Sequence, residues 1–153
     1  MRNLIRPLQP LVVVLAFTLL AGCNQNEKNM PTNILLKEWT GPYGGVPAFD
    51  QMKIEDVKPA MLKGIELNLK DIEAIANNTE DPTFENTIEE MERAGTELNR
   101  ASTYYGILSG NMSSPEFREV QAELAPKFSE LNSKITQNEK LFKRIKAVYD
   151  ASL

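Results

Sequence analysis

Three glutamates, Glu85, Glu89 and Glu92, recur at a spacing that places them on one face of a helix, where carboxylates could hold a cation. Sites for Ca²⁺ or Mg²⁺ need about six oxygen ligands in a shaped loop or pocket, and a straight helix offers only a row of carboxylates. A solvated acidic face is therefore the favoured interpretation. The chain has no histidine and a single cysteine, Cys23, so its sequence predicts that it binds no zinc and no other cofactor.

Other patterns that could do chemistry are equally incomplete. A serine or cysteine nucleophile needs a neighbouring base, usually histidine, and the chain has none. Segment 41–45 is glycine-rich, but it lacks the Gly-Lys-Ser/Thr ending of a phosphate-binding loop. Tyr104 and Tyr105 could stack on a substrate; Tyr105 falls on an apolar seam, which favours core packing, whereas Tyr104 fits either role. We therefore assign no catalytic residue and expect this chain alone to be inactive as an enzyme.

Residues 1–22 have the features of a lipoprotein signal peptide. Arg2 and Arg6 form a positive start, and the apolar run at 11–21 is shorter than the roughly 20 residues that a membrane-spanning helix needs. The Leu-Ala-Gly-Cys ending resembles a bacterial lipobox, which predicts lipidation of Cys23; the alternative is an ordinary signal peptide followed by a chance cysteine. We expect an exported, membrane-anchored lipoprotein at the periplasmic face or in the cell envelope, and either membrane fits.

Net charge limits the partners of the chain. The whole sequence carries −4 at pH 7, and removal of Arg2 and Arg6 leaves 15 basic and 21 acidic residues. Nucleic acid is excluded as a partner because phosphate binding needs clustered lysine and arginine. An acidic surface is not drawn to anionic lipid either, so attachment to a membrane would depend on the lipid on Cys23.

Two segments before the helices have no regular periodicity. Residues 23–34 are polar and predict a tether between the lipid and the folded body. Segment 41–47 contains three glycines and two prolines, which predicts an irregular loop or a series of turns. Trp39, Tyr43 and Phe49 give this loop aromatic groups to bury.

Helical periodicity begins near Pro59. Apolar residues recur every three or four positions and predict a first helix with Pro59 in its first turn and an end at Asn77. A second apolar seam steps alternately by four and three residues from Phe84 to Met112, which predicts one continuous long helix capped by Thr83.

Two further helices complete the predicted fold. A third long helix is predicted to start at 114–115 and to be kinked at Pro126, and Asn138 is the predicted N-cap of a shorter fourth helix. No β-strand pattern follows the apolar N-terminal run. The predicted fold class is all-α: an up-and-down bundle of three long helices plus a shorter one, preceded by an irregular Gly/Pro-rich segment.

Three motifs, in this order, resemble the opening segment of the thimet-oligopeptidase family of zinc metallopeptidases. They are Trp39–Asp50 (WTGPYGGVPAFD), Pro82–Ile88 (PTFENTI) and Leu124–Lys127 (LAPK). The first motif is most similar to the peptidyl-dipeptidase branch, although Ala48 stands where the family tends to have a second proline.

The resemblance implies an almost wholly helical protein with two lobes on either side of a deep channel. In such peptidases the zinc ligands and the general base come from a His-Glu-x-x-His helix and a downstream glutamate, so no catalytic or metal-binding residue is carried over to this chain. By analogy, residues 35–153 are the N-terminal helical part of a truncated zinc oligopeptidase-like domain that walls the substrate channel. Its partner would be the missing C-terminal catalytic portion, and its substrates would be oligopeptides cut near their C-terminus.

The alternative is a free-standing, lipid-anchored helical bundle that binds a partner and has no enzymatic activity. The last predicted helix reaches Leu153 with no glycine cap or polar tail, which favours a fragment. A fragment should leave an apolar seam uncovered, whereas a finished bundle should melt cooperatively as a monomer. Oligomeric state and substrate preference stay open.

Overall fold

The structure, a computed structural model, describes residues 33–42 and 45–153. The predicted signal peptide, the lipidation site Cys23 and most of the predicted tether lie outside the described residues. The described part is helical and contains no strand, which confirms the all-α prediction. None of its helices is both long enough and apolar enough to cross a membrane.

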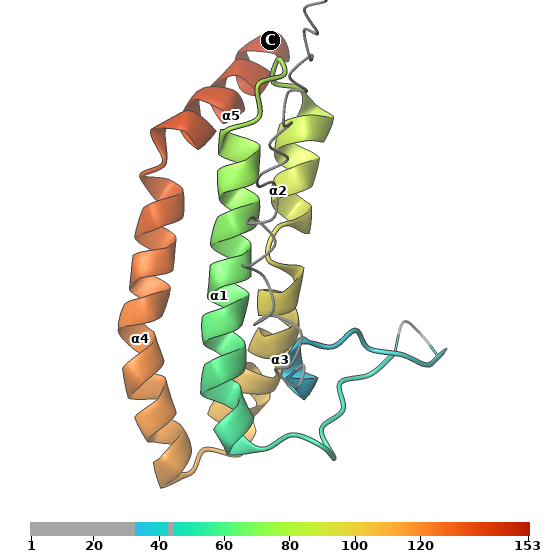
Figure 1. Cartoon of the computed structure of the whole chain (residues 1–153), viewed down its shortest axis with the longest axis vertical. Helices are drawn as coiled ribbons and strands as arrows, with labels where there is room; N and C mark the ends of the chain where they lie inside the picture. The colour runs from blue at the N-terminus through green and yellow to red at the C-terminus, as the bar shows by residue number, and fades with distance from the viewer. Residues whose placement is uncertain (1–32, 43–44) are drawn as a thin grey trace, which may run out of the picture. The chain divides into compact units, whose positions relative to one another are not determined.

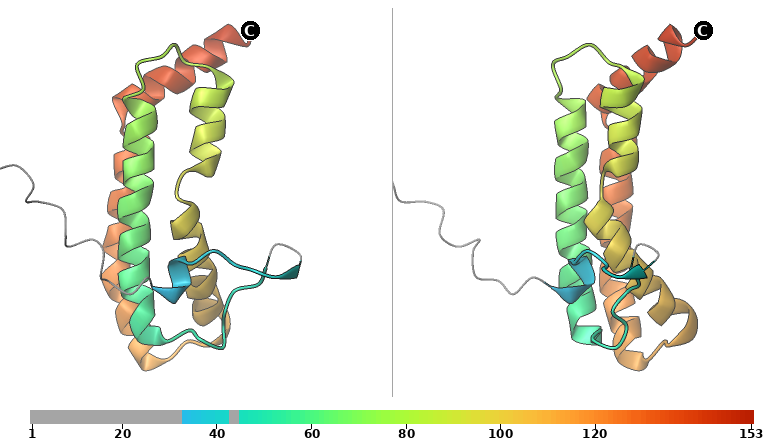
Figure 2. Two further views of the ribbon diagram at one scale, coloured as in Figure 1. Left: turned by 45° about the vertical axis from the view of Figure 1, so that its right-hand side comes forward. Right: turned by 90° about the vertical axis from the view of Figure 1, so that its right-hand side faces the viewer.

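A central helix organises the described part. The helix α1 packs against α3 on one side and against α4 on the other, and successive long helices run in opposite directions (Figures 1 and 2). The shorter α5 contacts α1 and η3. The elements in chain order are η1 (Ile34–Leu36, a 3₁₀ turn), α1 (Ile54–Ala76), η3 (Phe84–Glu89, a π-helix), α2 (Glu90–Arg93), α3 (Thr96–Asn111), α4 (Pro115–Thr136) and α5 (Glu139–Ala151).

Side-chain caps begin three of these helices at the predicted residues. Ser114 Oγ accepts a hydrogen bond from the backbone N–H of Phe117, and Asn138 Oδ1 accepts one from Leu141. Thr83 begins η3 in the same way. Each cap satisfies a backbone donor that the first turn of a helix leaves without a partner, which stabilises the start by about 1 kcal/mol.

The predicted start of the first helix was wrong, because α1 begins at Ile54, five residues before Pro59. Val57 is completely buried, so the apolar face of the helix already exists before the proline. The ring of Pro59 is exposed, and water can solvate the carbonyl group that loses its intrahelical donor. Glu55 and Asp56 in the first turn favour this start through the helix dipole.

The prediction of one continuous helix from Phe84 to Met112 was also wrong. Figure 2 shows a break between α2 and α3, where Ala94 is extended and Gly95 is left-handed with φ of +72°. The backbone approaches α1 closely at this point: the Gly95 N–H donates to Asp71 Oδ2 at 3.1 Å, and a Cβ on Gly95 would lie 2.8 Å from the Asn68 side chain. Only glycine fits both the φ angle and this space.

Two apolar clusters bury the inner faces of the helices. The larger one joins η1, α1, α3 and α4, and the smaller one joins the C-terminal part of α1 to α5. The larger cluster contains Leu35, Val57, Ala60, Met61, Ile65, Leu98, Ala101, Tyr104, Leu108, Phe117, Leu124 and Leu131. The smaller cluster contains Ile72, Ile75, Ala76 and Leu141.

Candidate functional site

The segment Trp39–Asp50 is held against α3 by one buried tyrosine. The backbone N–H of Ala48 donates to the Tyr104 hydroxyl at 2.8 Å, and Phe49 and Trp39 meet the Tyr104 ring edge-on, with centroid distances of 5.3 and 6.5 Å. Tyr104 has no exposed surface. The sequence left its role open, and the structure assigns it to the core, where its hydroxyl orders the N-terminal segment.

Gly45 shapes the same segment. Its φ angle is +83°, and a Cβ at this position would lie 2.5 Å from the carbonyl carbon of Trp39. Its N–H donates to the carbonyl oxygen of Pro42 at 3.0 Å. Glycine is therefore required at position 45 because the φ angle and the close approach to the backbone of Trp39 leave no room for a side chain.

Tyr105, the next residue along α3, packs in the core as predicted. Its half-buried ring meets the rings of Phe117 and Phe128 on α4, with centroid distances of 5.3 and 5.6 Å. Phe117 is completely buried, and so is Leu124 from the motif Leu124–Lys127. These aromatic and aliphatic contacts join α3 to α4.

The second motif, Pro82–Ile88, supplies two of the four hydrogen-bond acceptors of a buried arginine from α5. Arg144, which is 6% exposed, donates through Nη1 to the carbonyl oxygens of Asn78 and Glu80, both at 2.9 Å. Its Nη2 donates to Asn86 Oδ1 at 2.7 Å and to the Thr87 hydroxyl at 3.2 Å. All four acceptors are neutral, so Arg144 connects α5 to the turn before η3 without an ion pair.

Asn86 is shared between this network and the start of η3. Its Oδ1 accepts from the Thr83 N–H at 2.9 Å, and Thr83 Oγ1 accepts from the Asn86 N–H at 3.1 Å, which forms a capping box. The Asn86 Nδ2 donates to the carbonyl oxygen of Asp81 at 2.9 Å. Asn86 of this motif therefore connects the start of η3 to Arg144 of α5 through polar contacts.

Sequence reasoning missed Arg144. The sequence showed it as one member of a short basic run with Lys140, Lys143 and Lys146. Its position three residues after Leu141, on the inner face of α5, is the signal that could have separated it from those lysines.

The acidic residues on η3 and α2 form a solvated surface. Arg93 donates hydrogen bonds to Glu89 at 2.9 Å and to Glu90 at 2.6 Å, and these hydrogen bonds, first the one to Glu90 and then the one to Glu89, raise the pKa of Arg93. Hydrogen bonds from its own backbone N–H and then from the Thr83 hydroxyl lower the pKa of Glu85. Within residues 33–42 and 45–153, no group of three or more acidic or cysteine side chains is placed to hold a metal ion.

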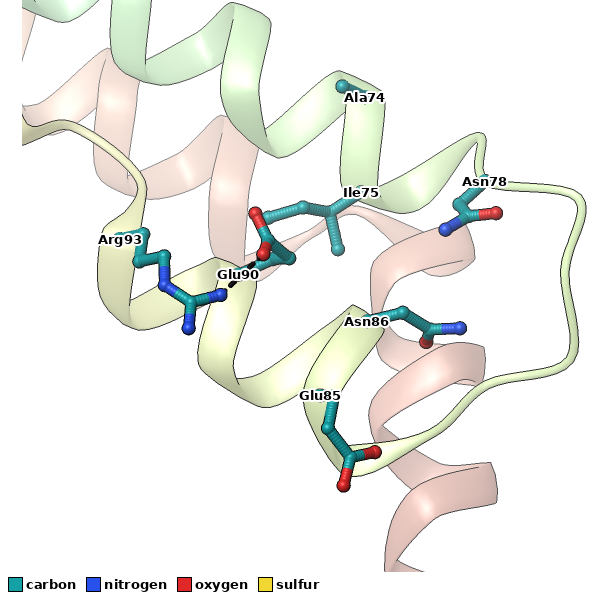
Figure 3. Close-up of a pocket in the computed structure, with 7 residues that line it drawn as sticks. All are labelled: Ala74, Ile75, Asn78, Glu85, Asn86, Glu90 and Arg93. Atoms are coloured by element: carbon teal, nitrogen blue, oxygen red, sulfur yellow. Dashed lines mark hydrogen bonds and ion pairs between the residues drawn. The ribbon is translucent and has the colours of Figure 1, made fainter.

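An open hollow of about 440 Å³ lies beside this surface (Figure 3). Its lining residues are Ala74, Ile75, Asn78, Glu85, Asn86, Glu90 and Arg93. The lining offers amides, carboxylates and one guanidinium, and no serine, cysteine or lysine is among these residues. A general acid among the carboxylates would need a raised pKa, whereas the pKa of Glu85 is lowered. Glu85 is therefore not suited to act as a general acid.

Comparison with known proteins gives the chain its relatives. No protein-family model matches it. Over 120 residues it is 30% identical to the dipeptidyl carboxypeptidase of Salmonella typhimurium, and over 117 residues it is 31% identical to that of Escherichia coli. These two peptidases are distant homologues of the chain. Their names agree with the resemblance to the peptidyl-dipeptidase branch.

The relatives are much longer than the matched part. The two alignments cover 78% and 76% of this chain, but only 18% and 17% of the relatives. The chain therefore spans less than a fifth of the length of the curated relatives that it matches.

Proposed function

We propose that residues 35–153 are a non-catalytic helical part of a zinc peptidase of the dipeptidyl carboxypeptidase type. The observation that carries this proposal is the 30% identity over 120 residues to a dipeptidyl carboxypeptidase. The positions of the motif residues support it: Gly45 packs against the backbone of Trp39, and Asn86 and Leu124 hold helices together. In this proposal the helices wall the substrate channel and help to restrict entry to short peptides.

The zinc of such a peptidase would be held elsewhere in its polypeptide. The donor set in the described residues does not fit zinc, since the chain has no histidine and no carboxylates gather at a metal-binding spacing. We therefore derive no catalytic step from this chain, and peptide hydrolysis belongs to the remaining polypeptide.

The proposal includes export and a lipid anchor. The Leu-Ala-Gly-Cys sequence at 20–23 makes Cys23 the acylated N-terminal residue of the mature protein. Replacement of Cys23 by serine should abolish incorporation of labelled palmitate and move the protein from the membrane fraction to the soluble fraction. Unchanged membrane association of the Cys23→Ser variant would contradict the anchor.

A chimera tests the peptidase proposal. The segment of the E. coli dipeptidyl carboxypeptidase that aligns with this chain is replaced by residues 35–153, and release of a C-terminal dipeptide from a blocked tetrapeptide is measured. We expect hydrolysis that a chelator abolishes, and no hydrolysis by the isolated chain with or without added zinc. A folded, zinc-containing chimera without activity would contradict the proposal. If the isolated chain also melts cooperatively as a monomer, the free-standing helical module becomes the better account.

A further inference from the structure

The inner face of α5 is packed against the rest of the described chain. Leu141 and Arg144 are buried, and Ile145 and Val148 are half-buried beside them. The helix α5 lies beside the C-terminal end of α1 (Figure 1) and contacts α1 and η3. The hydrogen bonds of Arg144 fix its position. The orientation of α5 is therefore set by the described residues themselves.

An aromatic stripe runs along one flank of the same helix. Phe142 is 63% exposed and Tyr149 is 61% exposed, and their separation of seven positions places them on one side of α5. Between them lies Lys146, whose charge is paired with Asp150. The stripe, defined by Phe142 and Tyr149, is thus apolar at both ends and carries a locally neutralised charge at its centre.

We propose that this stripe is the surface on which the remaining polypeptide of the peptidase packs. The inference rests on the proposed function, because it takes its occupant from the relatives, of which more than four-fifths lies beyond the matched segment. Large exposed aromatic side chains on a helix of fixed orientation are typical of interface anchors. The occupant is therefore an apolar surface of the same enzyme.

Net charge argues against a second copy as the occupant. After removal of Arg2 and Arg6 the chain has 15 basic and 21 acidic residues, so two copies repel each other at long range. The helix α5 itself carries four basic and two acidic side chains, so anionic lipid is kept as an outcome of the test below. An apolar surface within the same polypeptide is held close by its covalent connection and needs no attraction from a distance.

Thiol labelling tests the proposal directly. Cys23 is the only cysteine, so a Cys23→Ser background allows single reporters to be placed by Phe142→Cys and by Tyr149→Cys. Ala147→Cys is the matched control, because Ala147 is exposed on the same helix and lies roughly 140° around it from Phe142. Each reporter is labelled with a maleimide in the full chain and in an otherwise cysteine-free E. coli chimera.

We expect similar labelling rates at all three positions in the isolated chain. In the chimera the Phe142→Cys and Tyr149→Cys thiols should react more slowly by a factor of about ten or more, while the Ala147→Cys thiol keeps its rate. Equal rates at all positions in an active chimera would overturn the interface and leave the proposed function intact. A folded, zinc-containing chimera that is inactive before any cysteine is introduced would instead overturn the proposed function.

The isolated chain distinguishes the other occupants. Labelling at Phe142→Cys that speeds up on dilution would show that a second copy covers the stripe. Labelling that slows only when phosphatidylglycerol vesicles are added would show that lipid covers it. Either result overturns the proposal.

Discussion

The two ends of α1 differ in what surrounds them. The N-terminal end, near Val57, belongs to a cluster of twelve buried residues. The other end, near Ala76, belongs to a cluster of four buried apolar residues, and the buried Arg144 of α5 lies at this end too. The Val57 end gains most of its stability from burial of apolar surface, at about 25 cal/mol per Å². The Ala76 end depends on hydrogen bonds from one guanidinium, which are directional and fix geometry. The two ends of α1 are therefore held by two different kinds of contact: apolar packing at the Val57 end and directional hydrogen bonds at the Ala76 end.

The largest effect should come from the Val57 end. Phe117→Ala removes a completely buried ring that packs on Tyr105, and large-to-small changes of this kind cost about 3–5 kcal/mol. Urea unfolding of the chain measures the loss. Phe142→Ala removes an exposed ring and is the control; it should change the free energy of unfolding of the isolated chain by less than about 0.5 kcal/mol. Equal losses in the two variants would contradict the assigned core.

The next effect should come from the Ala76 end. Arg144→Met keeps the length of the side chain but leaves the acceptors on Asn78, Glu80, Asn86 and Thr87 without their donor, which should cost about 2–3 kcal/mol. Hydrogen exchange should rise in η3 and α5 and stay unchanged in α3.

Lys143→Met is the matched control for that change, because Lys143 is the exposed neighbour on the same helix. It should leave both the stability and the exchange pattern within error. If Arg144→Met is as stable as the Lys143 variant, the buried arginine does not hold the Ala76 end.

A smaller effect should follow from Gly45→Ala. A Cβ at a φ of +83°, 2.5 Å from the Trp39 carbonyl carbon, forces the backbone around Gly45 to shift and should cost about 1–2 kcal/mol. Trp39 is the only tryptophan, so its fluorescence reports the displacement. Gly106→Ala, at an exposed helical position with open space, should instead stabilise the chain by about 0.5–1 kcal/mol. Destabilisation of similar size in both variants would refute this account of Gly45.

The smallest expected effect is on the stability of the chain at acidic pH. Hydrogen bonds from Lys134, and secondarily from Lys127, lower the pKa of Glu130 on α4. A lowered pKa in the folded state contributes stability above the unfolded value of about 4.3, and this contribution is lost as pH falls through the folded value. Glu130→Gln should therefore flatten the acid side of the stability profile slightly, because the pair is exposed. A profile that steepens, or that changes near neutral pH, would contradict the assignment.

The predicted features that the structure confirms are local in sequence. Thr83, Ser114 and Asn138 cap helices because each bonds a backbone N–H only three residues away. The break at Gly95 could not be predicted in this way, since it depends on Asp71 of another helix.

Among the buried residues at the candidate site, too, the ones set by local sequence pattern were predicted and the ones set by contacts between distant segments were not. Tyr105 lies on the predicted seam and packs as expected, whereas Tyr104 is buried by a segment that lies 56 positions away in the chain. The burial of Arg144 could not be predicted, because a charged residue is expected on the surface unless the hydrogen-bond acceptors around it are known. Contacts between distant segments, and not helix propensity, decide these positions.

Dipeptide release by the E. coli chimera that carries residues 35–153 is the most direct test of the central claim. Our account predicts hydrolysis within about tenfold of the parent enzyme, since a folded wall without catalytic groups should affect positioning more than chemistry. Hydrolysis should also disappear when a chelator is added. A chimera that folds and retains zinc but releases no dipeptide would contradict the claim that these helices are part of such a peptidase.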